Sequence, residues 1–347
     1  MTEPGTTLRF RRPNGSTAEA TVTARHDDSL PAVPPLWSCL LTLEHGDGTE
    51  KVVRYLAPAS SGAAGGAAAA GVDHGADEAL DSEILAGLRL STLCGAKPYP
   101  ATVSRLIGYD AIAAEPYALL EPYRGRPVGS MGKVLPSART KFIESLLTGL
   151  RWINAAGIAH RAISPYTVYW DDRSAQITEF ASATLIGAPR EAMGAPPWQA
   201  REQRPGTVYG SVTDRDDTWA AGRLIFFAIT GQEITGPGQF AAAPDLERLL
   251  DGVFKAPEER PAAMELLGRL NVGDPVPRPP APPAAFQRGT SEFYAVRADK
   301  HPRTAPREEW GPEPDQSPLQ PRAQQAPRTM RAEQDKPASR RRWGRGR

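Results

Sequence analysis

Cysteine is scarce in this sequence, which has only two among 347 residues, Cys39 and Cys94. Two cysteines are too few for the disulfide framework of a small secreted protein, and they favour a reducing compartment. The apolar core of a signal peptide is also absent, because the chain begins MTEPGTTLRFRR. No stretch approaches the ~18 consecutive apolar residues that a membrane-spanning helix needs. These absences predict a cytoplasmic protein with no transmembrane segment.

Net charge is small as well. The chain has 41 basic and 40 acidic residues, which gives a formal net charge of +1. A nearly neutral chain has no bulk attraction to nucleic acid or to an anionic membrane. Hydrophobic residues, in contrast, make up 40% of the chain, which is enough to build a core. The length is that of one large two-lobed domain or of two domains.

Composition marks two segments that are not expected to pack. Residues 60–75 read SSGAAGGAAAAGVDHG and predict a flexible insertion, because Gly and Ala offer nothing large to bury. Residues 273–347 are rich in Pro, Gln and Arg and predict a disordered tail. Within this tail, the proline-rich residues 275–283 are typical of either a polyproline ligand or a spacer.

Between these two segments, predicted strands come first and predicted helices follow. Residues 37–44 and 51–56 are expected to form a hairpin around a His-Gly-Asp-Gly turn. Residues 117–120 form a further short apolar strand. Apolar residues at helical spacing predict helices over residues 77–90, 137–155, 218–230 and 262–270. This order favours an α+β protein with a sheet lobe and a helical lobe.

Five short motifs follow one another in the second half of the chain. Residues 157–168 read GIAHRAISPYTV, residues 177–181 read ITEFA and residues 194–203 read GAPPWQAREQ; DTWAAG follows at 217–222 and RP at 260–261. In this order and at this spacing they resemble the G-I-x-H-R-D-L-K-P-x-N-I, I-T-D-F-G and later motifs of the protein kinase superfamily, and of its bacterial Ser/Thr branch in particular.

The resemblance covers about residues 15–271 and is firmest from residue 115 onward. It implies a bilobal protein-kinase-like fold of the α+β class. Residues 1–121 would be a small β-rich N-terminal lobe, residues 122–272 a larger helical lobe, and residues 273–347 the disordered tail.

The residues that carry the chemistry of this family are changed in this sequence. Ala162 stands where an Asp accepts the proton of the substrate hydroxyl, Ser164 where a Lys stabilises the phosphate, and Thr167 where an Asn binds the second magnesium ion. A methyl group can neither accept a proton nor orient a hydroxyl group. The resemblance therefore implies that no catalytic residue is intact and that this is a degenerate member of the superfamily.

Nucleotide binding is in doubt for the same reason. The resemblance places Arg54 at the phosphate-binding lysine, with Glu83 either as its helix partner or as an ordinary exposed helix residue. It places Glu179 at the Asp that holds magnesium, so Glu179 is a metal ligand only if nucleotide and Mg²⁺ bind. Glu121 and Tyr123 lie in the segment that connects the lobes, and would be cofactor-binding residues if adenine docks there.

The leucines before Glu121 have two interpretations, since Leu119 and Leu120 either line an adenine site or only pack the core. The glycine-rich loop is missing, because residues 27–35 read DDSLPAVPP. Three prolines and no glycine cannot fold backbone N–H groups over a triphosphate, and two aspartates would repel it. We therefore expect no cofactor and regard Mg-ATP as doubtful.

Six further residues have structural roles by the same resemblance. They are His160, Arg161, Phe180, Glu202, Asp217 and Arg260. The resemblance implies that Glu202 pairs with Arg260 inside the helical lobe. It also implies that Asp217, at the start of a buried helix, holds the backbone of the catalytic loop, and a carboxylate is favoured at a helix N-terminus.

Together these features predict a pseudokinase that serves as a regulatory or scaffold module in bacterial signalling. The alternatives are a weakly active atypical Ser/Thr protein kinase and a sensor that binds ATP without transferring phosphate. Partners are expected to be other proteins, bound through the helical lobe and the tail. The basic run from Arg340 to Arg347 is either a solvated end or a weak contact for nucleic acid or an anionic surface.

Overall fold

The computed structural model describes residues 4–26, 35–46, 48–56, 75–95, 97–234, 240, 243–276 and 284–300. These all belong to one compact unit, Met1–Ala305. The expected insertion at 60–75 except its last residue, most of the segment 27–35 and the basic run from Arg340 to Arg347 lie outside the described residues. The domain boundaries expected at residues 121 and 272 stay predictions.

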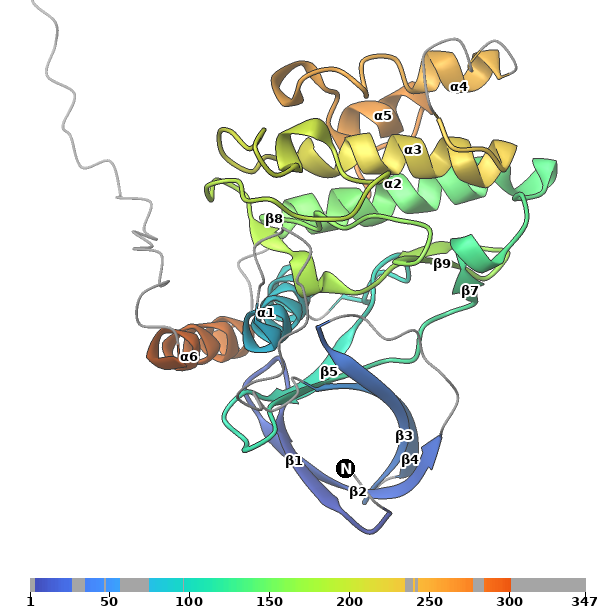
Figure 1. Cartoon of the computed structure of the whole chain (residues 1–347). Helices are drawn as coiled ribbons and strands as arrows, with labels where there is room; N and C mark the ends of the chain where they lie inside the picture. Colours follow the sequence, from blue (N-terminus) through green and yellow to red (C-terminus); the bar gives the residue numbers. More distant parts are fainter. Residues whose placement is uncertain are drawn as a thin grey trace, which may run out of the picture. The chain divides into compact units, whose positions relative to one another are not determined.

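Six antiparallel strands form the N-terminal part of the chain (Figure 1). They are β1 (Thr7–Arg11), β2 (Thr17–His26), β3 (Trp37–His45), β4 (Gly48–Leu56), β5 (Leu106–Asp110) and β6 (Tyr117–Leu120). The expected hairpin is confirmed, since β3 and β4 pair along their whole length from Trp37↔Leu56 to His45↔Gly48. The expected strand at residues 117–120 is confirmed as β6.

The prediction of a bilobal protein-kinase-like fold is wrong, because these strands close on themselves into a barrel in the order β1-β2-β3-β4-β6-β5. Helix makes up about 38% of the structure and strand about 22%. Closure depends on β1 and β2, which the sequence analysis did not predict. Strand β1 pairs with β2 on one side and meets β5 through Arg11 and Tyr109 on the other. Closing the sheet removes its exposed edges, and alternate side chains such as Phe10 and Val22 fill the interior.

A glycine permits the approach of β5 to β1. A Cβ atom added to Gly108 would lie 2.2 Å from Cδ2 of Phe10 and 3.0 Å from the carbonyl oxygen of Arg11. The register between β5 and β6 shifts at the same place, between Leu106 and Gly108. Glycine at this bulge therefore lets β5 approach β1 closely without a clash between its side chain and Phe10.

Replacing Gly108 by alanine is expected to destabilise the protein by about 1–3 kcal/mol. The new methyl group would overlap the ring of Phe10, so the ring or the strand would have to shift. The matched control is Gly268→Ala in α5 (Ala263–Arg269), where a Cβ atom meets nothing within 4 Å. Alanine there should be neutral or stabilising by a few tenths of a kcal/mol. Urea unfolding of both variants measures the difference, and equal free energies of unfolding would contradict this role of Gly108.

The C-terminal part of the unit is built from four helices, α2 (Arg139–Ala155), α3 (Asp216–Thr230), α4 (Pro244–Leu249) and α5. The predictions at 137–155, 218–230 and 262–270 are confirmed to within two residues. Figure 1 shows α2 and α3 lying one above the other, with α4 and α5 beyond them. Their core is continuous, and Phe142, Leu224 and Leu266 are among its fully buried members.

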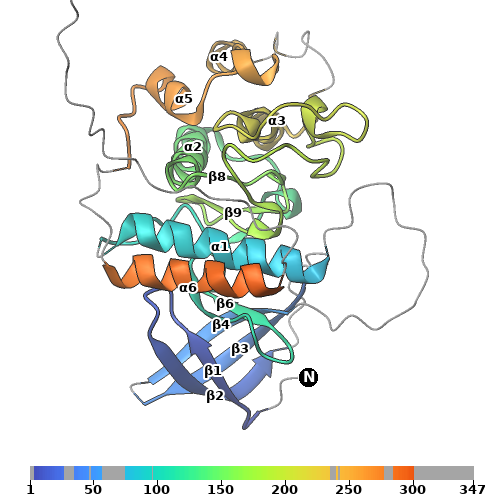
Figure 2. The same cartoon turned by 90° about the vertical axis from the view of Figure 1, so that its left-hand side faces the viewer.

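Two helices lie against the barrel, α1 (Ala76–Cys94) and α6 (Ala284–Lys300), and Figure 2 shows them side by side. Helix α6 corrects the expectation of a disordered tail from residue 273, because residues 284–300 are helical. Its Phe293 is buried and packs edge-to-face on Tyr109 of β5 at 5.5 Å. Lys300 donates to Asp81 of α1 at 2.9 Å. Helix α6 is only weakly apolar, and its packing against α1 and β5 stabilises it.

Short elements lie between the longer strands and helices: β7 (Arg126–Pro127), β8 (Ile158–Ala159), β9 (Val168–Trp170), β10 (Ala175–Ile177) and β11 (Thr184–Leu185), with the one-turn helices η1 (Val128–Ser130), η2 (Pro136–Ala138), η3 (Phe180–Ser182), η4 (Arg201–Gln203) and η6 (Pro257–Glu259).

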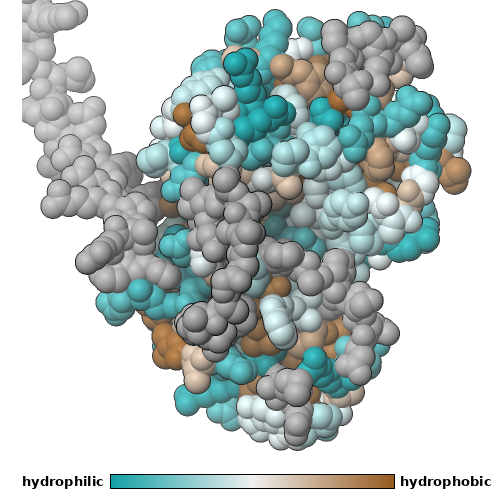
Figure 3. Space-filling model, viewed as in Figure 1, coloured by the Kyte–Doolittle hydropathy of each residue, from teal (hydrophilic) through white to brown (hydrophobic). Residues whose placement is uncertain are grey.

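On the face in Figure 3, hydrophilic surface predominates and hydrophobic residues form separate patches. None of the helices in the described ranges combines the length and the apolar run that crossing a bilayer requires.

Candidate functional site

The loop between β8 and β9 carries the residues of the catalytic-loop resemblance, and Asp217 of α3 holds its backbone. The carboxylate of Asp217 accepts hydrogen bonds from the N–H groups of His160 at 2.6 Å and Arg161 at 2.7 Å. Burial raises the pKa of Asp217 to about 6, against these two N–H donors. Arg161 adopts a left-handed conformation with φ of 64°. The structure therefore holds the loop as the resemblance implies for Asp217.

His160 is a buried, neutral part of this scaffold. Its Nε2 lies 2.8 Å from the carbonyl oxygen of Thr178, so the N–H donates there, while Nδ1 accepts from the N–H of Ala162 at 3.2 Å. Burial lowers the pKa of His160 to about 4. Its ring packs on Phe180 at 4.9 Å between centroids. With both nitrogens engaged in holding the loop, His160 is not placed to move a proton.

Two of the three positions that the resemblance assigned to catalysis, Ser164 and Thr167, are hydrogen-bonded within the loop. Thr167 Oγ1 donates to the carbonyl oxygen of Ala162 at 2.8 Å and accepts from the N–H of Ser164 at 2.9 Å. The nearest carboxylates along the chain, Asp171 and Asp172, lie in the turn between β9 and β10, where Asp171 accepts from the N–H of Ser174 at 2.7 Å. The loop is closed by its own hydrogen bonds, and Ala162 adds no group that can take a proton.

Two buried carboxyl groups lie close enough to interact electrostatically, Glu83 of α1 and Glu179, the residue before η3. The exposed fractions are 1% for Glu83 and 7% for Glu179. The pKa of each is raised to about 8, by burial in both cases and, for Glu83, also by the charge of Glu179. The N–H of Phe180 donates to Glu83 and opposes that shift. Neither carboxyl group has a cation among the described residues that influence its pKa, so the pair is favoured when at least one proton is bound.

Three tyrosines surround this pair. The hydroxyl groups of Tyr55 and Tyr123 are hydrogen-bonded to each other, and the rings of Tyr123 and Tyr169 pack edge-to-face at 5.0 Å. The charge of Glu179 acts on all three phenol groups, raising their pKa values beyond the effect of burial. Within the described residues, Oε2 of Glu83 and the hydroxyl of Tyr169 are buried without a hydrogen-bond partner.

Arg54 does not lie in this cluster and Glu83 is buried, so both expectations for Glu83, a partner of Arg54 or an exposed helix residue, are corrected. Its guanidinium group lies inside the barrel, 4.4 Å from the centre of the Tyr117 ring, and burial lowers its pKa. Successive residues of a strand face opposite sides. The interior therefore receives Arg54, whereas Tyr55 faces α1. The position nearest to Glu83 on β4 is a phenol and not a cation.

The segment that follows β6 is held by ordinary packing and a surface ion pair. Leu119 faces the barrel interior and Leu120 packs toward α1. Glu121 pairs with Arg105 at 3.2 Å with both side chains partly exposed. Tyr123, the other expected cofactor residue, belongs to the tyrosine cluster described above. Whether adenine docks beside these residues stays a prediction.

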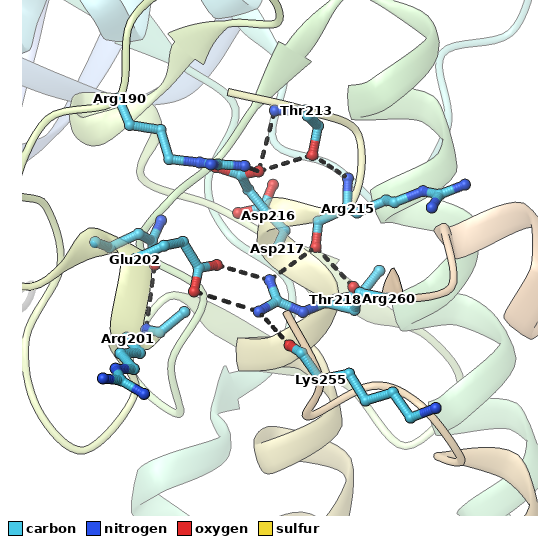
Figure 4. Close-up of polar contacts among 12 residues, drawn as sticks. Arg190, Arg201, Glu202, Thr213, Arg215, Asp216, Asp217, Thr218, Lys255 and Arg260 are labelled. Carbon is cyan, nitrogen blue, oxygen red and sulfur yellow. Dashed lines mark hydrogen bonds and ion pairs between the residues drawn. The ribbon is translucent and has the colours of Figure 1, made fainter. Parts of the chain in front are cut away.

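Two buried ion pairs support the helical part, and Figure 4 shows both. Glu202 accepts from Arg260 at 2.8 and 3.3 Å, as the resemblance implies. Arg190 donates twice to Asp216, at 2.9 and 2.8 Å. The second pair was missed by the sequence analysis, because the motif that assigned Asp217 to the loop gave no role to its neighbour Asp216 and no partner to Arg190. Only the fold shows which aspartate meets an arginine and which meets the loop.

A pocket of about 650 Å³ opens at the end of α1, and its lining includes Phe10, Cys94, Tyr99 and Phe286 but none of the residues of the carboxyl pair or the loop.

Cys39 and Cys94 are both free and buried. In the part of the chain that the structure describes, no group of three or more His, Cys, Asp or Glu side chains is arranged to hold a metal ion.

No protein-family model matches this sequence, and no curated protein matches it as a relative.

Proposed function

We propose that this protein is a non-catalytic regulatory or scaffold module, a degenerate relative of the bacterial Ser/Thr protein kinases that no longer transfers phosphate. The observation that carries the proposal is the buried Glu83–Glu179 pair, which has tyrosines as neighbours where the resemblance would require the phosphate-binding cation to be a partner of Glu83. A nucleoside triphosphate carries several negative charges that need cations to neutralise them, and no cation appears among the groups that shift the pKa of Glu83 or Glu179.

The loop chemistry supports the same proposal. Ala162 offers no proton acceptor, and the hydroxyl of Thr167 is engaged with the loop backbone. Phosphoryl transfer depends mainly on positioning and on neutralising charge, so one missing group can be tolerated more easily than several. The loop is kept in shape by Asp217 and His160 while the groups that would react are replaced.

The location and the partners follow from the proposal. Two free cysteines that are both buried agree with a reducing cytoplasm. The partners would be signalling proteins that contact the helical part of the chain and its Pro- and Arg-rich C-terminal residues.

The decisive experiment is thermal melting with and without Mg-ATP. We expect no change in melting temperature with about 5 mM Mg-ATP relative to Mg²⁺ alone. A ligand at 100 times its Kd would add about 2.7 kcal/mol to the stability, and binding of that strength would be plain in the melting curve. A reproducible rise specific to ATP would contradict the proposal.

A phosphotransfer assay then distinguishes the two alternatives. Transfer of labelled phosphate from ATP to the protein or to a general acceptor would indicate the atypical kinase. A melting shift without transfer would indicate the ATP sensor. The variant Ala162→Asp restores the carboxylate at the loop and serves as the control. We expect it to remain inactive, because the carboxyl pair and Tyr55 are unchanged in it.

A further inference from the structure

A pocket of about 410 Å³ opens beside the Glu202–Arg260 ion pair. Aromatic side chains from separate segments form its walls, with Tyr209 before α3, Trp219 within α3 and Phe254 after α4. Trp219 and Phe254 pack edge-to-face at 6.2 Å. Tyr209 is 49% exposed and borders the opening. Rigid aromatic walls of this kind are typical of places where a partner inserts one side chain.

The buried ion pairs hold these walls in place. Arg190, which is paired with Asp216, also donates to the carbonyl oxygen of Tyr209 at 2.9 Å. Arg223 lies over Trp219 with its guanidinium carbon 5.0 Å from the ring centre. Pro257 adds a buried apolar residue to the lining. The pocket is therefore preformed, and a ligand would lose little binding free energy to ordering it.

The charge around the pocket is positive. Arg201, Lys255 and Arg260 contribute to the lining, and Glu202 is its one carboxylate. Both oxygens of Glu202 are engaged by Arg260, which leaves the exposed cations Arg201 and Lys255 at the rim. Within the described residues, the ammonium group of Lys255 has a single long, exposed ion pair of 3.9 Å, to Glu259. Exposed ion pairs are weak and exchange readily, so these cations are free to meet an incoming anion.

We propose that this pocket binds an acidic peptide segment of a partner protein, with one aromatic side chain inserted between Trp219 and Tyr209 and flanking carboxylates at Arg201 and Lys255. Charge complementarity favours a separate partner over the chain's own C-terminal residues, because Arg and Lys outnumber Asp and Glu among residues 301–347. The proposal rests on the scaffold function above and gives that function a surface and a class of partner.

Fluorescence anisotropy of a dye-labelled peptide EEDFDEE with the full chain tests it. We expect saturable binding that is weakened at least tenfold in the peptide EEDADEE and abolished in KKRFRKK. The double variant Arg201→Glu, Lys255→Glu should lose binding at least tenfold and remain folded, because both side chains are exposed. Arg248→Glu on α4 is the matched control, since Arg248 is exposed and absent from the pocket lining.

Tyr209→Ala tests the aromatic wall separately from the charge, and it should also lower the affinity at least tenfold. Absence of binding at about 1 mM protein, a range that corresponds to only about −4 kcal/mol of binding free energy, would overturn the proposal. Equal binding of the Phe and Ala peptides, or of the wild type and the double variant, would overturn it too. None of these measurements involves nucleotide, so this proposal and the proposed loss of phosphotransfer succeed or fail independently.

Discussion

The melting temperature of this protein is expected to fall as the pH rises from 6.5 to 8. Glu83 and Glu179 have pKa values of about 8 in the folded protein against 4.5 when unfolded. Folding therefore binds protons between these values, and the stability present below pH 4.5 is lost as the pH rises toward 8. Full titration of one such group changes stability by up to about 1.4 kcal/mol per pH unit, so a loss of roughly 2–4 kcal/mol is expected over this window.

Other shifted groups act outside this window. The pKa of His160 is lowered to about 4 from 6.5, so its effect appears below pH 6.5 and opposes folding as the pH falls. The pKa of Asp217 is raised to about 6 from 3.8, so its contribution to stability is lost as the pH rises from 3.8 to 6. Cys94, raised to about 11 from 9.0, acts at higher pH. The interval from 6.5 to 8 thus reports on the carboxyl pair.

The variant Glu83→Gln should melt at a higher temperature than the wild type at pH 8, with a flatter dependence on pH. The amide keeps the shape and can still accept the N–H of Phe180, but it carries no charge to bury beside Glu179. The control is Glu247→Gln on α4, an exposed residue, which should leave the profile unchanged. A wild-type melting temperature that is constant between pH 6.5 and 8 would show that the pair is not buried as described.

Replacing Arg260 by methionine is expected to destabilise the protein by about 3–5 kcal/mol, because it leaves the carboxylate of Glu202 buried without its partner. The exposed fraction of both side chains is 2% or less, so the carboxylate would lose its cation at a largely desolvated position. Arg260 also donates to the carbonyl oxygens of Lys255 and Arg215, which would lose a donor as well. Chemical unfolding measures the loss.

The double variant Glu202→Leu, Arg260→Met separates the pair from its surroundings. It should recover part of the loss, because two apolar side chains need no partner. Glu258→Ala, at an exposed position close in sequence, is the control for a carboxylate whose removal leaves no buried charge. If the single and double variants were equally unstable, the two lost backbone hydrogen bonds of Arg260 would account for its role, and not the ion pair.

The local pattern of the sequence was sufficient for most single elements. Helices α1, α2 and α3 follow from apolar residues at helical spacing, and the β3–β4 hairpin from two apolar runs around Asp-Gly. These features depend on neighbours in the chain, so periodicity reports them directly. The motif resemblance also located Asp217 and the Glu202–Arg260 pair, since a motif keeps residues in order even where their contacts are distant.

Which side of a strand a residue faces was decided only in three dimensions. The resemblance placed Arg54 beside Glu83, but β4 turns Arg54 into the barrel and presents Tyr55. A shift of one residue moves a side chain to the opposite face of a strand, so a small misalignment inverts the chemistry of a site. The sequence therefore predicted a cation beside Glu83, and only the tertiary structure showed Tyr55 on that face of β4.

The composition of the chain and its local spacing determined that it has a core and where its main helices lie. The tertiary structure alone decided that the strands close through Gly108, that α6 is ordered against α1, and that Arg190 meets Asp216. These depend on contacts between residues far apart in the chain, and their strength comes from burial that exists only once the whole unit has folded.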